Sequence, residues 1–389
     1  MIAGVPKESY PGERRVALIP ASLPALAKLG LEVVVEPGAG DAAGFPDEAY
    51  REKGARIAGS RAELFETGRL LLQVRSFVAS PGGPPPDLGP LNSGHVVVGF
   101  LDPIGAPGGV KTLAERGATA FALDLIPRTT RAQAMDALSS VATIIGYKAV
   151  LLAADTLPRM FPMLMTAGGT LTAAKVFVIG GGVAGLQAIA TARRLGAVVE
   201  AYDIRPDVKE QVESLGARFV ELPLETRDSQ DAGGYAKAMD ESFYKRQREM
   251  MARVVAEHDV VIATAAVPGR KAPVLINAEM VAAMRPGSVI VDVAAEQGGN
   301  CEVTKPGEVV VRNGVCVQGP VNMASTLPYH ASQLHSRNLA NFLALIVKDG
   351  QLVVDLEDDI VRETLVARNG EVVHPRLREA LSLPALAAT

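Results

Sequence analysis

A glycine-rich turn between an apolar strand and a helix most constrains what this chain can fold into. Residues 176–185 read Val-Phe-Val-Ile-Gly-Gly-Gly-Val-Ala-Gly, so an apolar run leads into the pattern Gly180-x-Gly182-x-x-Gly185. A short continuous apolar run is typical of a strand buried on both faces of a parallel sheet. The first glycine permits the tight turn, the second lets the backbone approach a pyrophosphate, and the third lets the helix pack on the strand. The pattern predicts a parallel α/β domain that binds a dinucleotide.

A second predicted strand, residues 198–202, ends at an acidic residue. Asp203 follows it, 23 residues after Gly180. A carboxylate at this distance accepts hydrogen bonds from the ribose hydroxyls of adenosine, and its charge disfavours the 2′-phosphate of NADP. Arg205 weakens this preference, because an arginine there can pair with such a phosphate. We expect NAD(H) as the cofactor.

Length and composition limit the other possibilities. The 389 residues suffice for two domains with separate cores. A net charge of −4 and 4% aromatic residues do not favour nucleic-acid binding. Cys301 and Cys316 form no CxxC pattern and the five histidines are scattered, so we expect a reduced intracellular protein without a metal site. No signal peptide or spanning helix is expected, since the most apolar window, 176–192, contains the glycine turn and is followed by Arg193.

Strands and helices alternate along the first part of the chain, as in parallel βαβ units. Strands are predicted at residues 31–35, 70–74, 96–100 and 121–125. Helices from about residue 131 to 157 and from about 331 to 347 are long enough to bridge two domains. We therefore predict an α/β fold with two Rossmann-like domains bridged by long helices. A discontinuous N-terminal domain comprises residues 1–138 and 330–389, and an inserted dinucleotide-binding domain comprises residues 139–329.

A polar cluster follows the predicted strand 121–125, where parallel sheets bind ligands. Spacings of three place Gln133, Asp136 and Ser139 near one face of a helix. The alternative is a solvated helix start with Thr130 as its N-cap. The spacing alone leaves both interpretations open.

Residues 223–240 do not fit a minimal Rossmann unit. They are polar, contain glycines and carry one aromatic residue, Tyr235, between small and polar neighbours. Long loops beside a ligand site are often lids. A lid and a tolerated insertion are both compatible with this pattern.

The chain resembles the soluble NAD(H)-binding α subunit of proton-translocating NAD(P) transhydrogenases nearly from end to end, and alanine dehydrogenases more distantly. The shared motifs are residues 12–17 (GERRVA), 128–136 (RTTRAQAMD), 180–185 (GGGVAG), 202–205 (YDIR), 233–237 (GGYAK), 267–269 (VPG) and 292–301 (DVAAEQGGNC). Together these motifs are far more specific than the glycine pattern alone.

The resemblance implies roles for individual residues. The nicotinamide would be positioned by the catalytic set Arg128, Gln133, Asp136 and Ser139. Tyr235 would lie on a loop that closes over the cofactor. Further cofactor contacts would come from Thr129, Thr130, Arg131, Gly180, Gly182, Val183, Gly185, Asp203, Ile204, Arg205, Gly234, Gln247 and Ala266.

The implied reaction is direct hydride transfer from NADH to NADP⁺ on a partner subunit, coupled in the complex to proton translocation. No acid–base residue is needed, because no proton accompanies the hydride. The chain lacks the transmembrane segments of fused α subunits, so the resemblance implies a split form that does not itself insert into the membrane. It would be a cytoplasmic homodimer, held at the inner membrane by its membrane and NADP(H)-binding partner subunits.

An alanine dehydrogenase is the first alternative function. That family binds its substrate with an arginine, a lysine, a histidine and an aspartate. Arg15 matches the arginine, but Arg75, Asp102 and Glu296 stand where the other three would be. Without the imidazole there is no group suited to proton transfer near neutral pH. His95, seven residues before Asp102, would restore it if the alignment slips.

A catalytically silent NAD(H)-binding regulatory subunit is the second alternative. Arg128 and Gln133 argue against it, because a sensor needs no exposed nicotinamide. Tight NADH binding without hydride exchange would support it.

Overall fold

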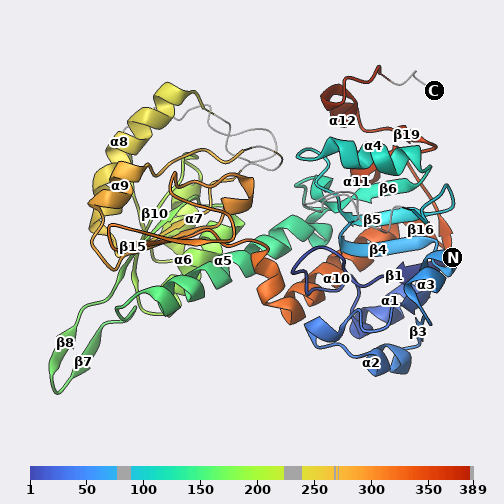
Figure 1. Ribbon diagram of the computed structural model, residues 1–389, viewed down its shortest axis with the longest axis horizontal. Coiled ribbons are helices and arrows are strands. Elements are labelled where there is room, and N and C mark those ends of the chain that lie inside the picture. Colours follow the sequence, from blue (N-terminus) through green and yellow to red (C-terminus); the bar gives the residue numbers. More distant parts are fainter. Residues whose placement is uncertain (77–88, 223–238, 267–268, 270, 386–389) are drawn as a thin grey trace. The chain divides into compact units, whose positions relative to one another are not determined.

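The protein is described by a computed structural model that covers residues 1–76, 89–222, 239–266, 269 and 271–385 (Figure 1). The chain forms two compact units, the first comprising Met1–Val141 and Ala324–Thr389 and the second Ala142–Met323. Each unit is built around one large sheet. The predicted fold class, α/β with two domains of mainly parallel sheet, is confirmed.

The first unit contains an eight-stranded sheet in the order β19-β18-β6-β5-β4-β1-β2-β3. Strands β1 to β6 are parallel, whereas β18 runs antiparallel to β6 and brings the C-terminal segment into the sheet. The strands are β1 (Ile2–Val5), β2 (Glu32–Val35), β3 (Arg56–Ile57), β4 (Leu70–Arg75), β5 (Val96–Phe100), β6 (Thr119–Ala122), β18 (Leu365–Arg368) and β19 (Glu371–Val372). Its helices are α1 (Leu23–Lys28), α2 (Asp47–Glu52), α3 (Arg61–Thr67), α4 (Pro107–Glu115), α10 (Pro328–Ile346), α11 (Asp359–Thr364) and α12 (Pro375–Ala380), with a small hairpin of β16 (Val347–Lys348) and β17 (Gln351–Leu352).

The second unit contains a seven-stranded sheet in the order β11-β10-β9-β12-β13-β15-β14. Only the pair β14–β15 is antiparallel. The strands are β9 (Lys175–Ile179), β10 (Val198–Tyr202), β11 (Arg218–Phe219), β12 (Val260–Ala263), β13 (Val289–Asp292), β14 (Val309–Arg312) and β15 (Val315–Gln318). The helices are α6 (Val183–Arg194), α7 (Val208–Ser214), α8 (Glu241–Glu257), α9 (Ala278–Ala283) and most of α5 (Ala137–Thr156). A separate hairpin of β7 (Leu164–Thr166) and β8 (Gly169–Leu171) extends away from the sheet of its unit (Figure 1).

Both faces of the second sheet are covered, which explains its continuous apolar strands. Side chains of β9 alternate between two cores: Val176 and Val178 pack with α5, α6 and α7, while Phe177 and Ile179 pack with α8 and α9. Successive side chains of a strand point to opposite faces, so a strand covered twice is apolar throughout. The prediction from the apolar run is confirmed in this detail.

Two predicted boundaries are wrong. The bridging helix α5 begins at Ala137, not near residue 131, because Asp136 caps it: its carboxylate accepts hydrogen bonds from the Ser139 N–H (2.8 Å) and hydroxyl (2.5 Å). Thr130 is therefore not the N-cap. Strand β6 ends at Ala122, and the chain turns there because the Asp124 carboxylate accepts a hydrogen bond from the N–H of Leu101 (2.7 Å).

The most membrane-like helix in the described part of the chain is α5, not the predicted window 176–192. It has 20 residues and a mean hydropathy of 1.7, and 28% of its apolar window is buried. By length and composition it can cross a membrane, but core helices of soluble proteins meet the same criteria. This helix begins in the first unit and continues into the second.

The turn between β9 and α6 requires glycine for two different reasons. Gly180 adopts a φ of +97°, which side-chain-bearing residues rarely do. A Cβ on Gly185 would lie 1.8 Å from the carbonyl oxygen of Gly180. A Cβ on Gly182 would meet no atom within 4 Å, so the fold itself leaves that position open.

We expect Gly185→Ala to destabilise the second unit by about 2–3 kcal/mol, because the methyl group forces α6 away from β9. Gly182→Ala is the matched control and should cost less than about 1 kcal/mol, the scale of an N-cap change. Thermal and urea unfolding of the two variants measure the difference. Equal stability of both variants would contradict the close strand–helix contact.

Candidate functional site

The second unit has a ligand edge where its strand order reverses. Neighbouring strands β9 and β12 lead to helices in opposite directions along the sheet, and α/β proteins bind ligands at the carboxyl ends of such strands. Gly180 follows β9 at this edge, and Thr264 follows β12. The Thr264 hydroxyl lies 3.0 Å from the Gly180 carbonyl oxygen and 3.2 Å from that of Ile179. This hydroxyl ties the ends of the two strands together.

The N-terminus of α6 at this edge suits an anion. The first N–H groups of a helix have no acceptor within it, and they carry a partial positive charge. The N-cap residue is Gly182, so no side chain caps the helix, and its first turn contains no acidic residue. Together with the open space at Gly182, these features fit the pyrophosphate of a dinucleotide.

Asp203 lies at the end of β10, beside this turn, and its carboxylate is fully engaged. Oδ2 accepts hydrogen bonds from the Gly181 N–H (2.7 Å) and the Arg205 Nη2 (2.8 Å). Oδ1 accepts from the N–H (2.8 Å) and Nε (2.9 Å) of Arg205. A carboxylate offers about four acceptor positions, so these donors occupy them all. A ribose hydroxyl can bind Asp203 only if it displaces the Arg205 side chain.

This ion pair also alters the charge argument made from the sequence. The side chain of Asp203 is 5% exposed and that of Arg205 is 13% exposed, so the pair is shielded from solvent. Arg205 neutralises much of the charge with which Asp203 would repel a 2′-phosphate. The preference for NAD over NADP therefore depends on where Arg205 lies when the cofactor binds.

The remaining predicted contacts of this unit differ in accessibility. Gln247 on α8 is buried, and its amide donates to the Tyr202 hydroxyl (2.9 Å), while burial raises the pKa of Tyr202 to about 12. Ala266 is exposed beyond β12, and Val183 and Ile204 are half-buried. Gln247 thus supports the floor of the edge. Gly234 and Tyr235, with the rest of the predicted lid at 223–238, lie outside the described residues.

The first unit carries the other predicted residues on one loop, residues 128–136, hereafter the 128–136 loop. Arg128, Thr129, Thr130 and Gln133 are exposed, whereas Asp136 is half-buried and bound to Ser139 as described above. A 3₁₀ turn occupies Gln133–Met135, so these residues are not on the face of a continuous helix. The structure brings Asp136 and Ser139 together and leaves Arg128 and Gln133 facing solvent.

Arg131, predicted to contact the cofactor, is bound to carboxylates instead. Its guanidinium donates to both oxygens of Asp358 (2.6 and 2.8 Å) and also to Asp359. The hydrogen bonds from Arg131 lower the pKa of Asp358 to about 2. No sequence pattern links these residues, which stand 227 positions apart.

The residues considered for alanine dehydrogenase chemistry are held in other contacts. Arg15 is buried, and its guanidinium forms a two-pronged ion pair with Glu13 (2.8 and 2.7 Å). Arg75 lies over the ring of Tyr10, 4.2 Å from its centre. Glu296 accepts a hydrogen bond from the N–H of Asn322 (3.1 Å).

Neither buried histidine of this unit near the sheet replaces the missing imidazole. His95 precedes β5, at the amino end of the strand, and its ring nitrogens lie 3.1 Å from the Asn92 N and 3.0 Å from the Phe65 carbonyl. His335, which sequence reasoning missed, lies 3.2 Å from the Gln73 carbonyl. Burial and the nearby charge of Arg15 lower its pKa to about 4, so it is neutral at pH 7.

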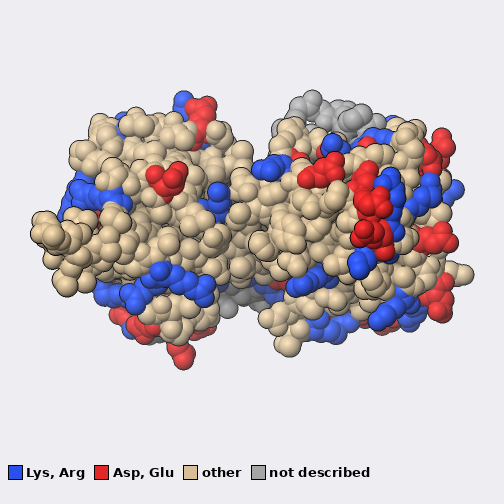
Figure 2. All heavy atoms as spheres, turned by 90° about the horizontal axis from the view of Figure 1, so that it is seen from below, with Lys and Arg blue, Asp and Glu red and all other residues tan. Residues whose placement is uncertain are grey.

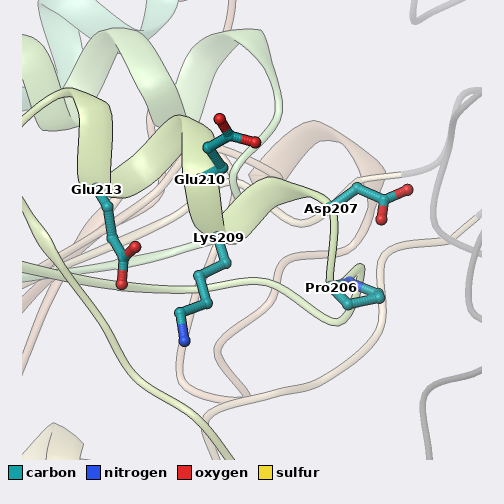
Figure 3. A pocket seen from close by; sticks show the side chains of 5 residues that line it. All are labelled: Pro206, Asp207, Lys209, Glu210 and Glu213. Carbon is teal, nitrogen blue, oxygen red and sulfur yellow. The ribbon is translucent and has the colours of Figure 1, made fainter.

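Surface features near the site are modest. A pocket of about 470 Å³ on α7 and the turn before it is lined by Pro206, Asp207, Lys209, Glu210 and Glu213, whose polar ends point outwards (Figure 3). It contains none of the predicted site residues, and its three carboxylates would repel phosphate. Acidic and basic side chains lie in mixed groups on the face shown in Figure 2.

Comparison with known proteins connects these features. The family models "Alanine dehydrogenase/PNT, N-terminal domain" and "C-terminal domain" match residues 4–145 and 149–375. The first of the separate parts of NAD(P) transhydrogenase subunit alpha in Rhodospirillum rubrum is 45% identical over 380 residues, which cover 97% of this chain and 99% of that protein. A crystal structure of transhydrogenase from Sinorhizobium meliloti is 43% identical with a TM-score of 0.85, covering 96% of this chain and 100% of that one.

Alanine dehydrogenase is a more distant relative. The enzyme of Bacillus subtilis is 28% identical over 382 residues, which cover 96% of this chain and 93% of that enzyme. Both groups therefore share the whole two-domain fold, and sequence identity separates them. The chain belongs to the alanine dehydrogenase and transhydrogenase family, and within it to the NAD(P) transhydrogenase alpha subunits.

Proposed function

We propose that this chain is the NAD(H)-binding component of a proton-translocating NAD(P) transhydrogenase. The proposal rests on one observation above all: an uncapped helix N-terminus over open space at Gly182, beside the buried Asp203. The N–H groups of α6 hold the pyrophosphate and Asp203 accepts the ribose hydroxyls. Arg128, Gln133, Asp136 and Ser139 are the residues that position the nicotinamide.

The chemistry belongs to the nicotinamide, which when bound supplies a hydride that passes to NADP⁺ on a partner subunit and leaves NAD⁺ and NADPH. The protein need not donate or accept a proton. Its task is to orient the donor, to exclude water and to hold the loop residues in place. The neutral His335 and the remote His95 support this reaction over amino-acid oxidation, which requires proton exchange near neutral pH.

Mixing the chain with NADP(H)-binding and membrane subunits of a transhydrogenase tests this function. Hydride transfer from NADH to an NADP⁺ analogue should require the partner, and Gln133→Ala should slow it by about 10- to 100-fold through loss of orientation. The affinity for NADH should change less than about threefold, since most binding energy comes from the adenosine and pyrophosphate.

Controls separate this function from its alternatives. NADH with pyruvate and ammonium, without the partner, should give no oxidation; oxidation there would identify an amino-acid dehydrogenase. Tight NADH binding without transfer in the presence of active partner subunits would identify a regulatory subunit. Either result would refute the proposal.

Arg205 offers a test of cofactor choice. We expect Arg205→Gln to free the Asp203 carboxylate for ribose and to expose its charge to a 2′-phosphate. The ratio of NADH to NADPH affinity should rise about 5- to 10-fold, roughly 1 kcal/mol of discrimination. Fluorescence titration with both cofactors measures the ratio. An unchanged ratio would mean that the Asp203–Arg205 pair does not govern the choice.

We also propose that the chain is a homodimer, held at the cytoplasmic face of the membrane by partner subunits. The β7–β8 hairpin supports this proposal: Met163, Met165 and Leu171 are 61%, 80% and 47% exposed. Apolar side chains gathered on a projecting hairpin are typical of a surface that another chain covers.

Met165→Asp should shift the dimer towards monomer at micromolar concentration, because it would bury a charge in the contact. Val309→Asp on β14, which replaces a valine of 62% exposure, is the matched control. Sedimentation velocity distinguishes the two species. Dissociation by both variants, or by neither, would count against the hairpin as the contact.

A further inference from the structure

Two asparagines of α10 hold the 128–136 loop by a single backbone oxygen. Asn338 and Asn341, three residues apart on the helix, donate Nδ2 hydrogen bonds of 2.9 and 3.0 Å to the carbonyl of Ala134. A carbonyl oxygen has two lone pairs, so both acceptor positions are filled. Residues of α10 and of the loop are more than 200 positions apart, so no local pattern reveals this contact.

The backbone around this carbonyl is fixed from the other side as well. The N–H of Met135, in the same peptide group, donates to the carbonyl of Ala132 (2.8 Å). Ala132 is fully buried and Met135 is 8% exposed, so both anchor the loop in the core of the first unit. Gln133 lies between them, and its own N–H and C=O bond to Thr130 and Asp136. Its side chain is the exposed part of a loop whose backbone is held throughout.

Arg131 provides a second anchor. Its two-pronged pair with Asp358 joins the loop to the start of α11, where Asp358 is the N-cap and accepts from the N–H groups of Ile360 (2.9 Å) and Val361 (3.2 Å). A fork of this kind fixes direction as well as distance. The loop is thus tied to α10 at one point and to α11 at another.

Asn338 indicates that this arrangement does not serve stability alone. The residue is 6% exposed, and its Oδ1 is buried without a hydrogen-bond partner in the described structure. A buried unpartnered amide oxygen is destabilising, and an apolar residue of similar size would avoid it. The amide therefore stabilises one loop conformation at the expense of a fully satisfied core.

We propose that Asn338, Asn341 and Arg131 are positioning residues, which hold the 128–136 loop so that Gln133 and Arg128 present one fixed geometry to the nicotinamide. Arg131 acts through its pair with Asp358 and does not itself contact the cofactor. The inference rests on the proposed role of this loop in hydride transfer.

Three variants weaken the anchors without removing a structural cap. Asn338→Leu keeps the side-chain volume, Asn341→Ala changes an exposed residue, and Asp358→Asn retains the oxygen that caps α11. In the complex with partner subunits each should lower the hydride-transfer rate about tenfold, the scale of a small misorientation. The NADH dissociation constant should change less than about twofold, and the melting temperature should shift by less than about 3 °C.

Hydrogen exchange gives a second measure that does not depend on activity. Amides of residues 130–136 should exchange about tenfold faster in the variants, because local opening of the loop becomes easier. Arg337→Ala, on the exposed side of α10, is the matched control and should alter neither exchange nor transfer.

The outcomes are distinguishable. Unchanged exchange in all three variants would show that these residues do not hold the loop and would overturn the inference. Faster exchange with wild-type transfer would overturn the positioning role. An inactive wild-type chain with competent partner subunits would refute the proposed function and with it the positioning role, whereas exchange would still report whether the anchors hold the loop.

Discussion

The contact between the first turn of α6 and the end of β9 is the constraint on which the ligand edge depends. Because Gly185 has no side chain, the helix approaches the Gly180 carbonyl more closely than any other residue permits. This approach places the free N–H groups of α6 at the carboxyl ends of the central strands, where the strand order reverses. The neighbouring Gly181 N–H, Asp203 and Thr264 are then fixed by hydrogen bonds to the same turn.

Asp203 and Arg205 show that the edge is organised around charge before any ligand binds. A carboxylate with 5% exposure needs partners, and Arg205 and the Gly181 N–H supply them. Cofactor binding must exchange some of these contacts for ribose hydroxyls. The free energy of that exchange, and not the charge of Asp203 alone, sets the discrimination between NAD and NADP.

The 128–136 loop follows a different principle. Its backbone is held by groups from α10 and α11 that are distant in sequence, while Arg128 and Gln133 face outwards. A site that only orients its substrate requires such rigidity, because a misplacement of about 1 Å costs on the order of 100-fold in rate.

The sequence predicted those parts of the molecule that local patterns determine. The strand, turn and helix around Gly180 are as expected, since an apolar run and three glycines encode them within ten residues. The start of α5 was misplaced because the Asp136–Ser139 cap competes with the helical pattern upstream. The partners of Arg131 and Ala134 could not be predicted, because they depend on contacts that only the folded chain creates. The roles of Gly234 and Tyr235 stay predictions.

Titration of NADH into Gly182→Ala tests the central claim most directly, since this position is open in the fold and crowded only if a pyrophosphate lies against it. We predict wild-type secondary structure and a loss of NADH affinity of at least about 100-fold, measured by fluorescence or calorimetry. Wild-type affinity in a properly folded Gly182→Ala protein would show that the cofactor does not bind at this helix N-terminus and would contradict the account.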